Sequence, residues 1–509
     1  MTFETANSSG RKVALALLAA LSLAYFLSVI VPGRLAVTDE VFFKAAGRNW
    51  AATGHFAAPE LTGRLTEGPP LSEIYFAQPP IYTFLFGVYV KLLGFGPRLC
   101  FAYDAMIHLL LMWSAMIFTR TVYRVDWRWA ALSGALLATL GTAGRPDELG
   151  IVFAMWAAVA FRSRLPDPWR VTLGGVLLGL CVCTSLGAFL FLSPLVLLEL
   201  FTARTDRAGR IADLAVASLA GLSVAATCVA PILIAHPAAY RQLIEHAGEQ
   251  SSLLSALTGE QRNSSLGFVA LWKSMMRYGY NYGLLIGGPL LFAALCGWLT
   301  KFYLRPVYSR IAVLLASWVV LFIAMPGKYP YFWFQGCLLL IACVALAAHA
   351  QESLSPWRGR FLLALGLVLW MAASAQSIRW GYILWTLPAD QKLSVNDQRV
   401  REEVPPGEGV MTTDYWWDLA DRDTVYDLVF SDPGVRAVDY IVLSGNGSGR
   451  AGVPTDYKEK YKPGFRPIFD QLNATPPHIS RLAISHSGYG FGAYVLKKYS
   501  ASPGAAAQK

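Results

Sequence analysis

The sequence predicts a polytopic α-helical membrane protein of about eleven transmembrane helices, followed by a small α/β domain. Three observations support this fold class. The 509 residues are 55% hydrophobic and 15% charged, which is too apolar for a soluble chain of this length. The apolar residues gather in runs of membrane-spanning size, about 17–25 residues each. Beyond residue 380 these runs stop, and proline, glycine and charged residues become frequent.

Eleven apolar runs are candidate membrane spans. The first follows Arg11 and Lys12 without a small-residue cleavage pattern after it, which indicates an uncleaved anchor. A further run over 79–94 is short, begins with two prolines and contains Lys91. We expect this segment to lie at the membrane surface. The eleven predicted spans are 13–31, 99–119, 129–144, 148–162, 170–184, 186–202, 211–235, 283–303, 310–325, 331–349 and 360–379.

Basic residues predict the orientation of these spans. With 79–94 at the surface, the loops on one side collect the basic clusters, whereas the short loops opposite carry Arg145 and Lys328. The positive-inside rule then predicts a cytoplasmic N-terminus and an extracytoplasmic C-terminal domain, and we expect a bacterial inner membrane. The net charge of +10 is explained by anionic lipid headgroups, so no nucleic-acid partner is expected. The clusters are Arg11/Lys12, Arg120/Arg124/Arg128, Arg162/Arg164/Arg170, Arg204/Arg207/Arg210, Lys301/Arg305/Arg310 and Arg358/Arg360.

The C-terminal part has the pattern of a small mixed domain. We predict a membrane domain over 1–380, an α/β domain over 381–499 and a disordered tail over 500–509. The seven cysteines show neither metal-site spacing nor a disulfide framework, so we expect them to be buried packing residues. Alternation of apolar residues predicts strands at 410–413, 439–443 and 493–498, and a helix at 423–429.

An acidic pair, Asp39 and Glu40, follows the first predicted span and opens the outer loop 32–98. Carboxylates at the water-side mouth of a membrane protein can accept a proton or hold a metal ion. The alternative is that the two acids favour the positive N-terminal end of a helix.

The residues after this pair predict a helix lying in the headgroup layer. Phe42, Ala46 and Trp50 recur on one face, whereas Lys44 and Arg48 occupy another. An apolar stripe opposite a basic face is typical of helices in the membrane interface.

A second acidic position follows in the segment Arg145-Pro-Asp-Glu148, between two predicted spans. The functional interpretation is that Asp147 or Glu148 faces Asp39 across a cavity, with Arg145 near an anionic substrate group. The alternative is an ordinary turn, in which proline and aspartate serve local hydrogen bonding.

Two further segments carry candidate substrate-binding residues. Gln78 and Tyr82 frame a Pro-Pro segment that is either a helix start or the lining of a polar pocket. Lys328 and Tyr331 lie in a short outer loop. Lys328 either extends to lipid headgroups or pairs with a substrate phosphate.

Taken together, the acidic pair, the Gln-Pro-Pro segment, the Arg-Pro-Asp turn and the Lys-Tyr-Pro-Tyr loop resemble the GT-C class of integral membrane glycosyltransferases. The resemblance covers roughly residues 10–380. It is nearest to protein O-mannosyltransferases and the bacterial aminoarabinose and galacturonic acid transferases. It implies that Asp39 is the catalytic acid, that Glu40 accompanies it and that Asp147 is the second acidic position. Some relatives have lysine where this chain has Gln78, so the phosphate-contacting role passes to Lys328 or Arg145.

The resemblance implies transfer of a sugar from a polyprenyl-phosphate carrier to a hydroxyl of a glycan, lipid or protein at the outer face of the membrane. Our hypothesis is an inverting displacement with Asp39 as base. It includes a divalent ion held by Glu40 or Asp147 as an open alternative. A transporter or flippase for a lipid-linked or small anionic substrate, and a receptor with an outer sensing domain, are the other candidates. The enzyme is favoured because the candidate acids gather at one surface rather than at the membrane midplane.

Overall fold

The chain divides into two compact units in the computed structural model. One unit comprises Met1–Phe26, Phe76–Thr83 and Asp104–Ile378, and the other comprises Leu27–Tyr75, Phe84–Tyr103 and Arg379–Lys509. The structure describes residues 8–30, 38–61, 71–138, 144–204, 206–242, 291–295, 305–324, 332–351, 393–412, 424–426, 438–445, 464–470 and 491–498, with isolated residues between 357 and 419.

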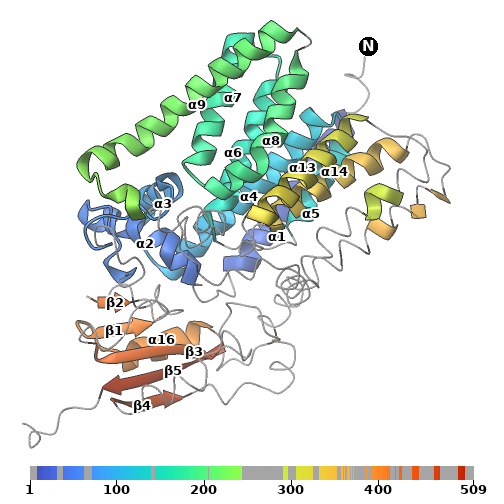
Figure 1. Ribbon diagram of the computed structural model, residues 1–509. Helices are drawn as coiled ribbons and strands as arrows, with labels where there is room; N and C mark the ends of the chain where they lie inside the picture. The colour runs from blue at the N-terminus through green and yellow to red at the C-terminus, as the bar shows by residue number, and fades with distance from the viewer. Residues whose placement is uncertain are drawn as a thin grey trace, which may run out of the picture. The chain divides into compact units, whose positions relative to one another are not determined.

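The first unit is a bundle of long apolar helices (Figure 1). Nine of the eleven predicted spans coincide with helices, and the other two, 283–303 and 360–379, lie largely outside the described residues. Among the described residues, four helices are long and apolar enough to cross a membrane. The total of eleven spans therefore stays a prediction. The helices are α1 (Ser8–Ile30), α4 (Pro97–Val122), α5 (Trp127–Leu137), α6 (Pro146–Arg162), α7 (Asp167–Val182), α8 (Leu186–Ala203), α9 (Arg207–Ala235), α13 (Arg305–Ala324) and α14 (Phe332–Gln351).

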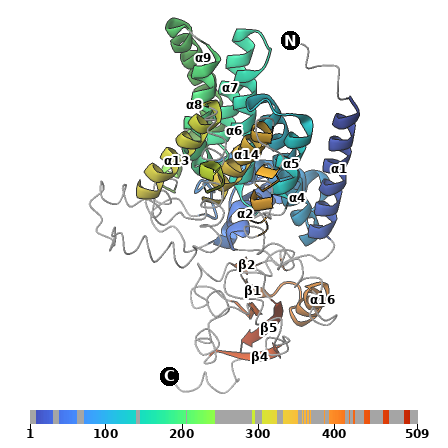
Figure 2. The same cartoon turned by 90° about the vertical axis from the view of Figure 1, so that its right-hand side faces the viewer.

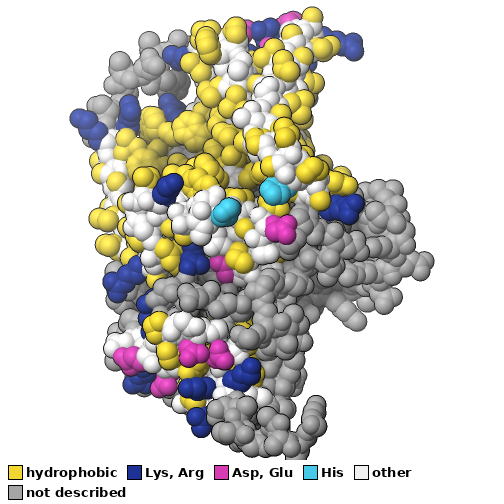
Figure 3. All heavy atoms as spheres, turned by 90° about the vertical axis from the view of Figure 1, so that its left-hand side faces the viewer, with side chains coloured by type: hydrophobic (Ala, Val, Ile, Leu, Met, Phe, Trp, Pro, Cys, Tyr) yellow, Lys and Arg dark blue, Asp and Glu magenta, His cyan; other side chains and the backbone are white. Residues whose placement is uncertain are grey.

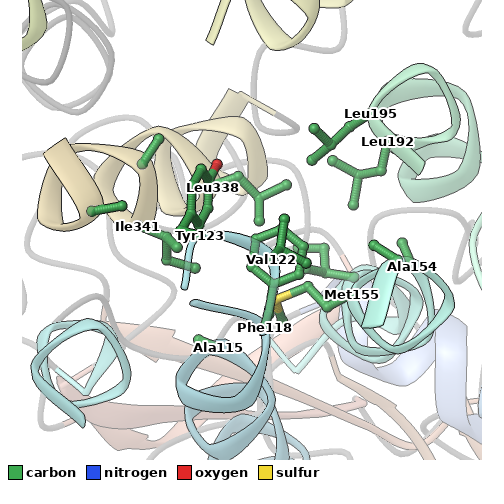
Figure 4. Close-up of a cluster of buried hydrophobic side chains, with 14 of the residues drawn as sticks. Ala115, Phe118, Val122, Tyr123, Ala154, Met155, Leu192, Leu195, Leu338 and Ile341 are labelled. Atoms are coloured by element: carbon green, nitrogen blue, oxygen red, sulfur yellow. The ribbon is translucent and has the colours of Figure 1, made fainter. Parts of the chain in front are cut away.

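The core of this bundle lies where α4, α6, α8 and α14 face one another (Figures 2 and 4). Phe118 of α4 and Met155 of α6 are buried there with Leu195 of α8 and Leu338 of α14. Outward faces of the bundle carry hydrophobic side chains over much of their surface, with charged side chains scattered between them (Figure 3). This distribution is that of helices whose outer faces meet lipid rather than water.

Helices α7 and α9 are in backbone contact because each has small residues at four-residue spacing. A β-carbon added at Gly175 would collide with the carbonyl oxygen of Ala217, and one at Gly179 would lie 2.6 Å from the carbonyl oxygen of Gly221. Glycine at these positions lets two helices approach closely, as is common between membrane helices.

The second unit contains a mixed five-stranded sheet. The strand order is β2-β1-β3-β5-β4, with β1 parallel to β2 and β3, and β5 antiparallel to β3 and β4. Helix α16 (Leu393–Glu403) packs against β5. The strands are β1 (Gly409–Thr412), β2 (Thr424–Tyr426), β3 (Tyr440–Gly445), β4 (Phe465–Asp470) and β5 (Phe491–Lys498).

The three predicted strands are confirmed as β1, β3 and β5. The predicted helix at 423–429 is wrong over its described part, because Thr424–Tyr426 forms strand β2 beside β1. Its β-branched and aromatic residues favour an extended conformation.

Three short elements of the predicted outer loop also belong to the second unit: α2 (Thr38–Thr53), η1 (Pro59–Leu61) and α3 (Pro80–Leu93) from Phe84 onward. A helix of 14 residues such as α3 rises about 21 Å, less than the roughly 30 Å of a bilayer core. Helix α5, which coincides with a predicted span, is shorter still at 11 residues. Length alone therefore does not decide the position of 79–94, and its surface location stays a prediction.

Candidate functional site

A buried polar cluster occupies one end of the bundle in the first unit. It lies where α6 and α8 begin, beside α4 and the first turn of α3. Buried polar groups require partners, and the hydrogen bonds among these residues supply them. The cluster comprises Tyr82, Asp104, His108, Asp147, Glu148 and Ser185, each at most 4% exposed.

The second acidic position of the sequence, Asp147, is held on both oxygens. The hydroxyl of Ser185 donates to Oδ1, and Nε of Arg145 lies 3.0 Å from Oδ2. Arg145 is the N-cap residue of α6, Pro146 follows it, and Asp147 and Glu148 stand in the first turn. The positive end of the helix favours both carboxylates there. The predicted turn is therefore a helix start, at which Arg145 and Asp147 contact each other. The functional interpretation, in which Arg145 meets an anionic substrate group, stays a prediction.

Tyr82 belongs to the same cluster. Its hydroxyl lies 3.2 Å from Oδ1 of Asp104 and 3.0 Å from the carbonyl oxygen of Gly144. A hydroxyl carries one hydrogen and therefore donates to one of these two acceptors at a time. The contact joins the first turn of α3 to the residue that precedes Arg145.

His108 lies one helical turn beyond Asp104 and faces Glu148. Its Nε2 is 3.0 Å from the carbonyl oxygen of Leu137, and its Nδ1 is 3.4 Å from Oε2 of Glu148. A carbonyl oxygen only accepts, so Nε2 carries a hydrogen and donates it there, while Nδ1 faces the carboxyl of Glu148. The ring of Tyr25 stacks on the imidazole at 4.7 Å, which fixes its orientation.

Sequence reasoning missed Asp104, His108 and Ser185. A usable signal was present for the first two, because Asp104 and His108 stand at i and i+4 within an apolar run. Ionisable residues inside a membrane helix are rare and usually functional. No comparable signal marked Ser185, which contacts Asp147 only through the packing of α8 on α6.

The first acidic position belongs to the second unit. Asp39 and Glu40 lie in the first turn of α2, where the structure describes the backbone of Asp39 and the full burial of Glu40. Asp39 and Asp147 belong to different units. Their meeting across a cavity therefore stays a prediction.

The predicted interfacial character of α2 is wrong. Lys44 is fully buried, with its ammonium 5.6 Å from the ring of Phe86 and 5.9 Å from that of Tyr103. Residues 41–47 are buried on every side of the helix. Two aromatic faces compensate a desolvated cation, so Lys44 is a packed residue one turn beyond Glu40 and not part of a headgroup-facing surface.

Glu60 in η1 is a second buried acid of this unit. Its carboxylate lies 3.2 Å from an Arg48 nitrogen and 3.2 Å from Nδ2 of Asn49. Burial raises the pKa of Glu60 from 4.5 to about 6, against the lowering by its own backbone hydrogen bond and by Arg48 and Asn49. Strand β2 contacts η1, so Glu60 stands where the outer loop meets the C-terminal sheet.

The remaining predicted residues have a less defined place. Gln78 is half-buried in the first unit, and Lys328 and Tyr331 lie outside the described residues. No group of three or more His, Cys, Asp or Glu side chains suited to a metal ion occurs within the part of the chain that the structure describes. A metal held by Glu40 or Asp147 stays an untested alternative.

Comparison with known proteins supports the fold. No protein-family model and no curated protein matches the sequence. The structure is similar to ArnT from Cupriavidus metallidurans bound to undecaprenyl phosphate, with a TM-score of 0.61, 13% identity and coverage of 97% of this chain and 99% of ArnT. It is also similar to arabinofuranosyltransferase AftD from Mycobacteria, at TM-score 0.51 and 14% identity, over 96% of this chain and 42% of AftD. The apo oligosaccharyltransferase of Archaeoglobus fulgidus matches at TM-score 0.50 and 14% identity, over 85% of this chain and 69% of that protein. The chain has the fold of the GT-C integral membrane glycosyltransferases.

Proposed function

We propose that the chain is a membrane glycosyltransferase that moves a sugar from a polyprenyl-phosphate carrier to a hydroxyl acceptor at the outer face of the membrane. The observation that carries the proposal is the match over nearly the full length of both chains to ArnT, solved with undecaprenyl phosphate. The buried acids at the starts of α2 and α6 support it, because the sequence places them at the two acidic positions of the family it resembles.

Asp39 is the proposed base. It takes the proton of the acceptor hydroxyl while the acceptor oxygen forms a bond to the anomeric carbon and the bond from that carbon to the phosphate oxygen breaks. Attack on the face opposite the leaving phosphate inverts the anomeric centre. A base so placed contributes about 10²–10⁴ in rate.

The leaving phosphate is an anion and needs positive charge more than a proton donor. Arg145 is the proposed contact among the described residues, with Lys328 as the second candidate. The Nε of Arg145 donates to Asp147, and Asp147 in turn accepts a hydrogen bond from Ser185. Orientation of a guanidinium by a carboxylate suits it to phosphate recognition.

Transfer by the purified protein tests the proposal. The donor is a polyprenyl phosphate carrying a labelled sugar, offered with a panel of hydroxyl acceptors, and the product is identified by mass spectrometry. Asp39→Asn should lower turnover by about 10²–10⁴ and leave donor binding unchanged. The matched control is Glu73→Gln, which removes an exposed acid of the same outer loop. Undiminished turnover of Asp39→Asn removes the base assignment, and passage of donor across vesicles without transfer indicates a flippase.

A further inference from the structure

The arginines of the bundle divide into two groups by the partners they have. Arg162 and Arg310 both contact the buried carboxylate of Glu199, and Arg170 and Arg204 contact Asp213. These positive charges are neutralised within the protein.

A second group surrounds Trp127 and has no such neutralisation. The guanidinium of Arg11 lies 5.0 Å from the Trp127 ring centre, and that of Arg120 lies 5.6 Å from it. Arg120 donates to the carbonyl oxygen of Val125. We call the set formed by Arg11, Lys12, Arg120, Arg124 and Arg128 around Trp127 the basic cluster.

None of these five basic side chains makes an ion pair within the part of the chain that the structure describes. The one acid among them, Asp126, accepts the backbone N–H of Arg128 as the N-cap of α5. Counted over the described residues 11–12 and 120–128, the basic cluster therefore has five basic residues beside one acidic residue.

The backbone of the basic cluster is also unusual. Arg124, in the turn between α4 and α5, has φ +57°, and it is the only residue other than glycine with a positive φ among the described residues. This left-handed conformation is disfavoured for any residue with a β-carbon and favours glycine. A strained arginine at a turn that would suit glycine indicates that its side chain is needed there.

Apolar surface begins directly beside the charges. Val13, Leu17 and Leu21 recur every four residues along α1, immediately after Arg11 and Lys12, and are 57%, 60% and 44% exposed. Positively charged side chains and exposed apolar side chains are thus adjacent on one helix. Tryptophan between such regions is typical of the membrane interface.

We propose that the basic cluster binds the headgroup of an anionic glycerophospholipid, whose acyl chains lie along the exposed stripe of α1. The lipid phosphate lies between the guanidinium groups of Arg11, Arg124 and Arg128, while Trp127 holds Arg11 and Arg120 in place. A lipid is favoured over a soluble anion because the apolar stripe adjoins the charges.

The test measures binding of fluorescently labelled phosphatidylglycerol to the purified full-length protein in nonionic detergent, with labelled phosphatidylcholine as the zwitterionic comparison. The variant of the basic cluster is Arg11→Gln/Arg124→Gly/Arg128→Gln. Each cation near a membrane contributes about fivefold to anionic lipid binding, so the triple variant should bind on the order of a hundredfold more weakly. The matched control, Arg399→Gln/Arg466→Gln/Lys498→Gln, removes three exposed charges of the C-terminal domain and should bind as the wild type does.

Arg124→Gly alone provides a variant that folds readily, since glycine suits the left-handed turn, and it should weaken binding about fivefold. Three results overturn the proposal. The first is that the basic-cluster variants bind phosphatidylglycerol as tightly as the wild type does. The second is that the wild type binds phosphatidylcholine equally well, and the third is that inorganic phosphate displaces the lipid at equal concentration. The last result would show an ordinary anion site without a lipid preference.

Discussion

Replacement of Glu60 by glutamine should make the contact of η1 with α2 independent of pH. The folded-state pKa of Glu60 is about 6, raised from 4.5 because burial disfavours the charged form. Because the folded-state pKa lies above the unfolded value, the fold is most stable below pH 4.5, where Glu60 is neutral in both states. This stabilisation is lost as the pH rises through about 6. The wild-type contact should therefore weaken over this interval and stay constant above it.

The size of the effect follows from the same shift. A difference of about 1.5 pH units corresponds to about 2 kcal/mol, or roughly thirtyfold in the local opening equilibrium. Glutamine removes the cost of burying a charge and can still accept hydrogen bonds from Arg48 and Asn49, which now contact Glu60. Glu60→Gln should accordingly be more stable above pH 6, by at most this amount, and equal to the wild type below pH 4.5.

Amide hydrogen exchange reports this local opening. The N–H of Ala58 donates to Leu71, and the N–H of Leu61 donates to Ala58, so both amides exchange when η1 opens. Protection of wild type and Glu60→Gln is compared at equal pH, which cancels the intrinsic exchange rate. Greater protection of the wild type above pH 6 would refute the reasoning, because it would mean that attraction to Arg48 outweighs the burial of the charge.

Two further changes probe the first unit. His108→Gln keeps a hydrogen bond to Leu137 but loses the contact of the imidazole Nδ1 with Glu148, and we expect a loss of thermal stability in detergent of about 1–3 kcal/mol, together with weaker donor binding. Glu199→Gln leaves Arg162 and Arg310 without a counter-charge and should cost about 3–5 kcal/mol in the same assay, with donor binding unchanged.

Thr119→Val is the matched control for His108→Gln. Thr119 is buried on the same helix and hydrogen-bonds Ser133, but it belongs to the apolar core and not to the polar cluster. It should lower thermal stability without changing donor binding. If His108→Gln behaves as Thr119→Val does, the imidazole serves packing alone, and the polar cluster has no part in substrate recognition.

Much of the first unit could be predicted because long apolar runs determine membrane helices with little dependence on the rest of the fold. Apolar runs located α6 and α8 to within a few residues at each end. Strands β1 and β5 were equally readable, since apolar and β-branched residues in short runs favour strands, and all four residues of β1 are buried. The short strand β2 was not, because three residues carry too weak a pattern and its conformation depends on pairing with β1.

The burial of individual charges could not be read in the same way. Lys44 has the spacing of a surface residue, but the rings of Phe86 and Tyr103, from segments far along the chain, lie near its ammonium. Likewise the contact between Ser185 and Asp147 depends on how α8 packs against α6. Sequence spacing describes one helix at a time, whereas these contacts belong to pairs of helices.

Polar contacts join helices α6 and α8 at both of their ends. Mutations at the two ends should have different effects, because only one end carries the polar cluster. Asp147 and Ser185 join the first turns, while Arg162 and Glu199 join the last turns at 2.7 Å. The fifteen residues from Asp147 to Arg162 separate these contacts by about 22 Å. Two such contacts on parallel helices restrict tilting, so the position of Asp147 does not depend on either contact alone. Loss of Glu199 should therefore lower the stability of the bundle while leaving the geometry around Arg145 intact. Weakened donor binding in Glu199→Gln would mean instead that the distant contact sets the position of the polar cluster.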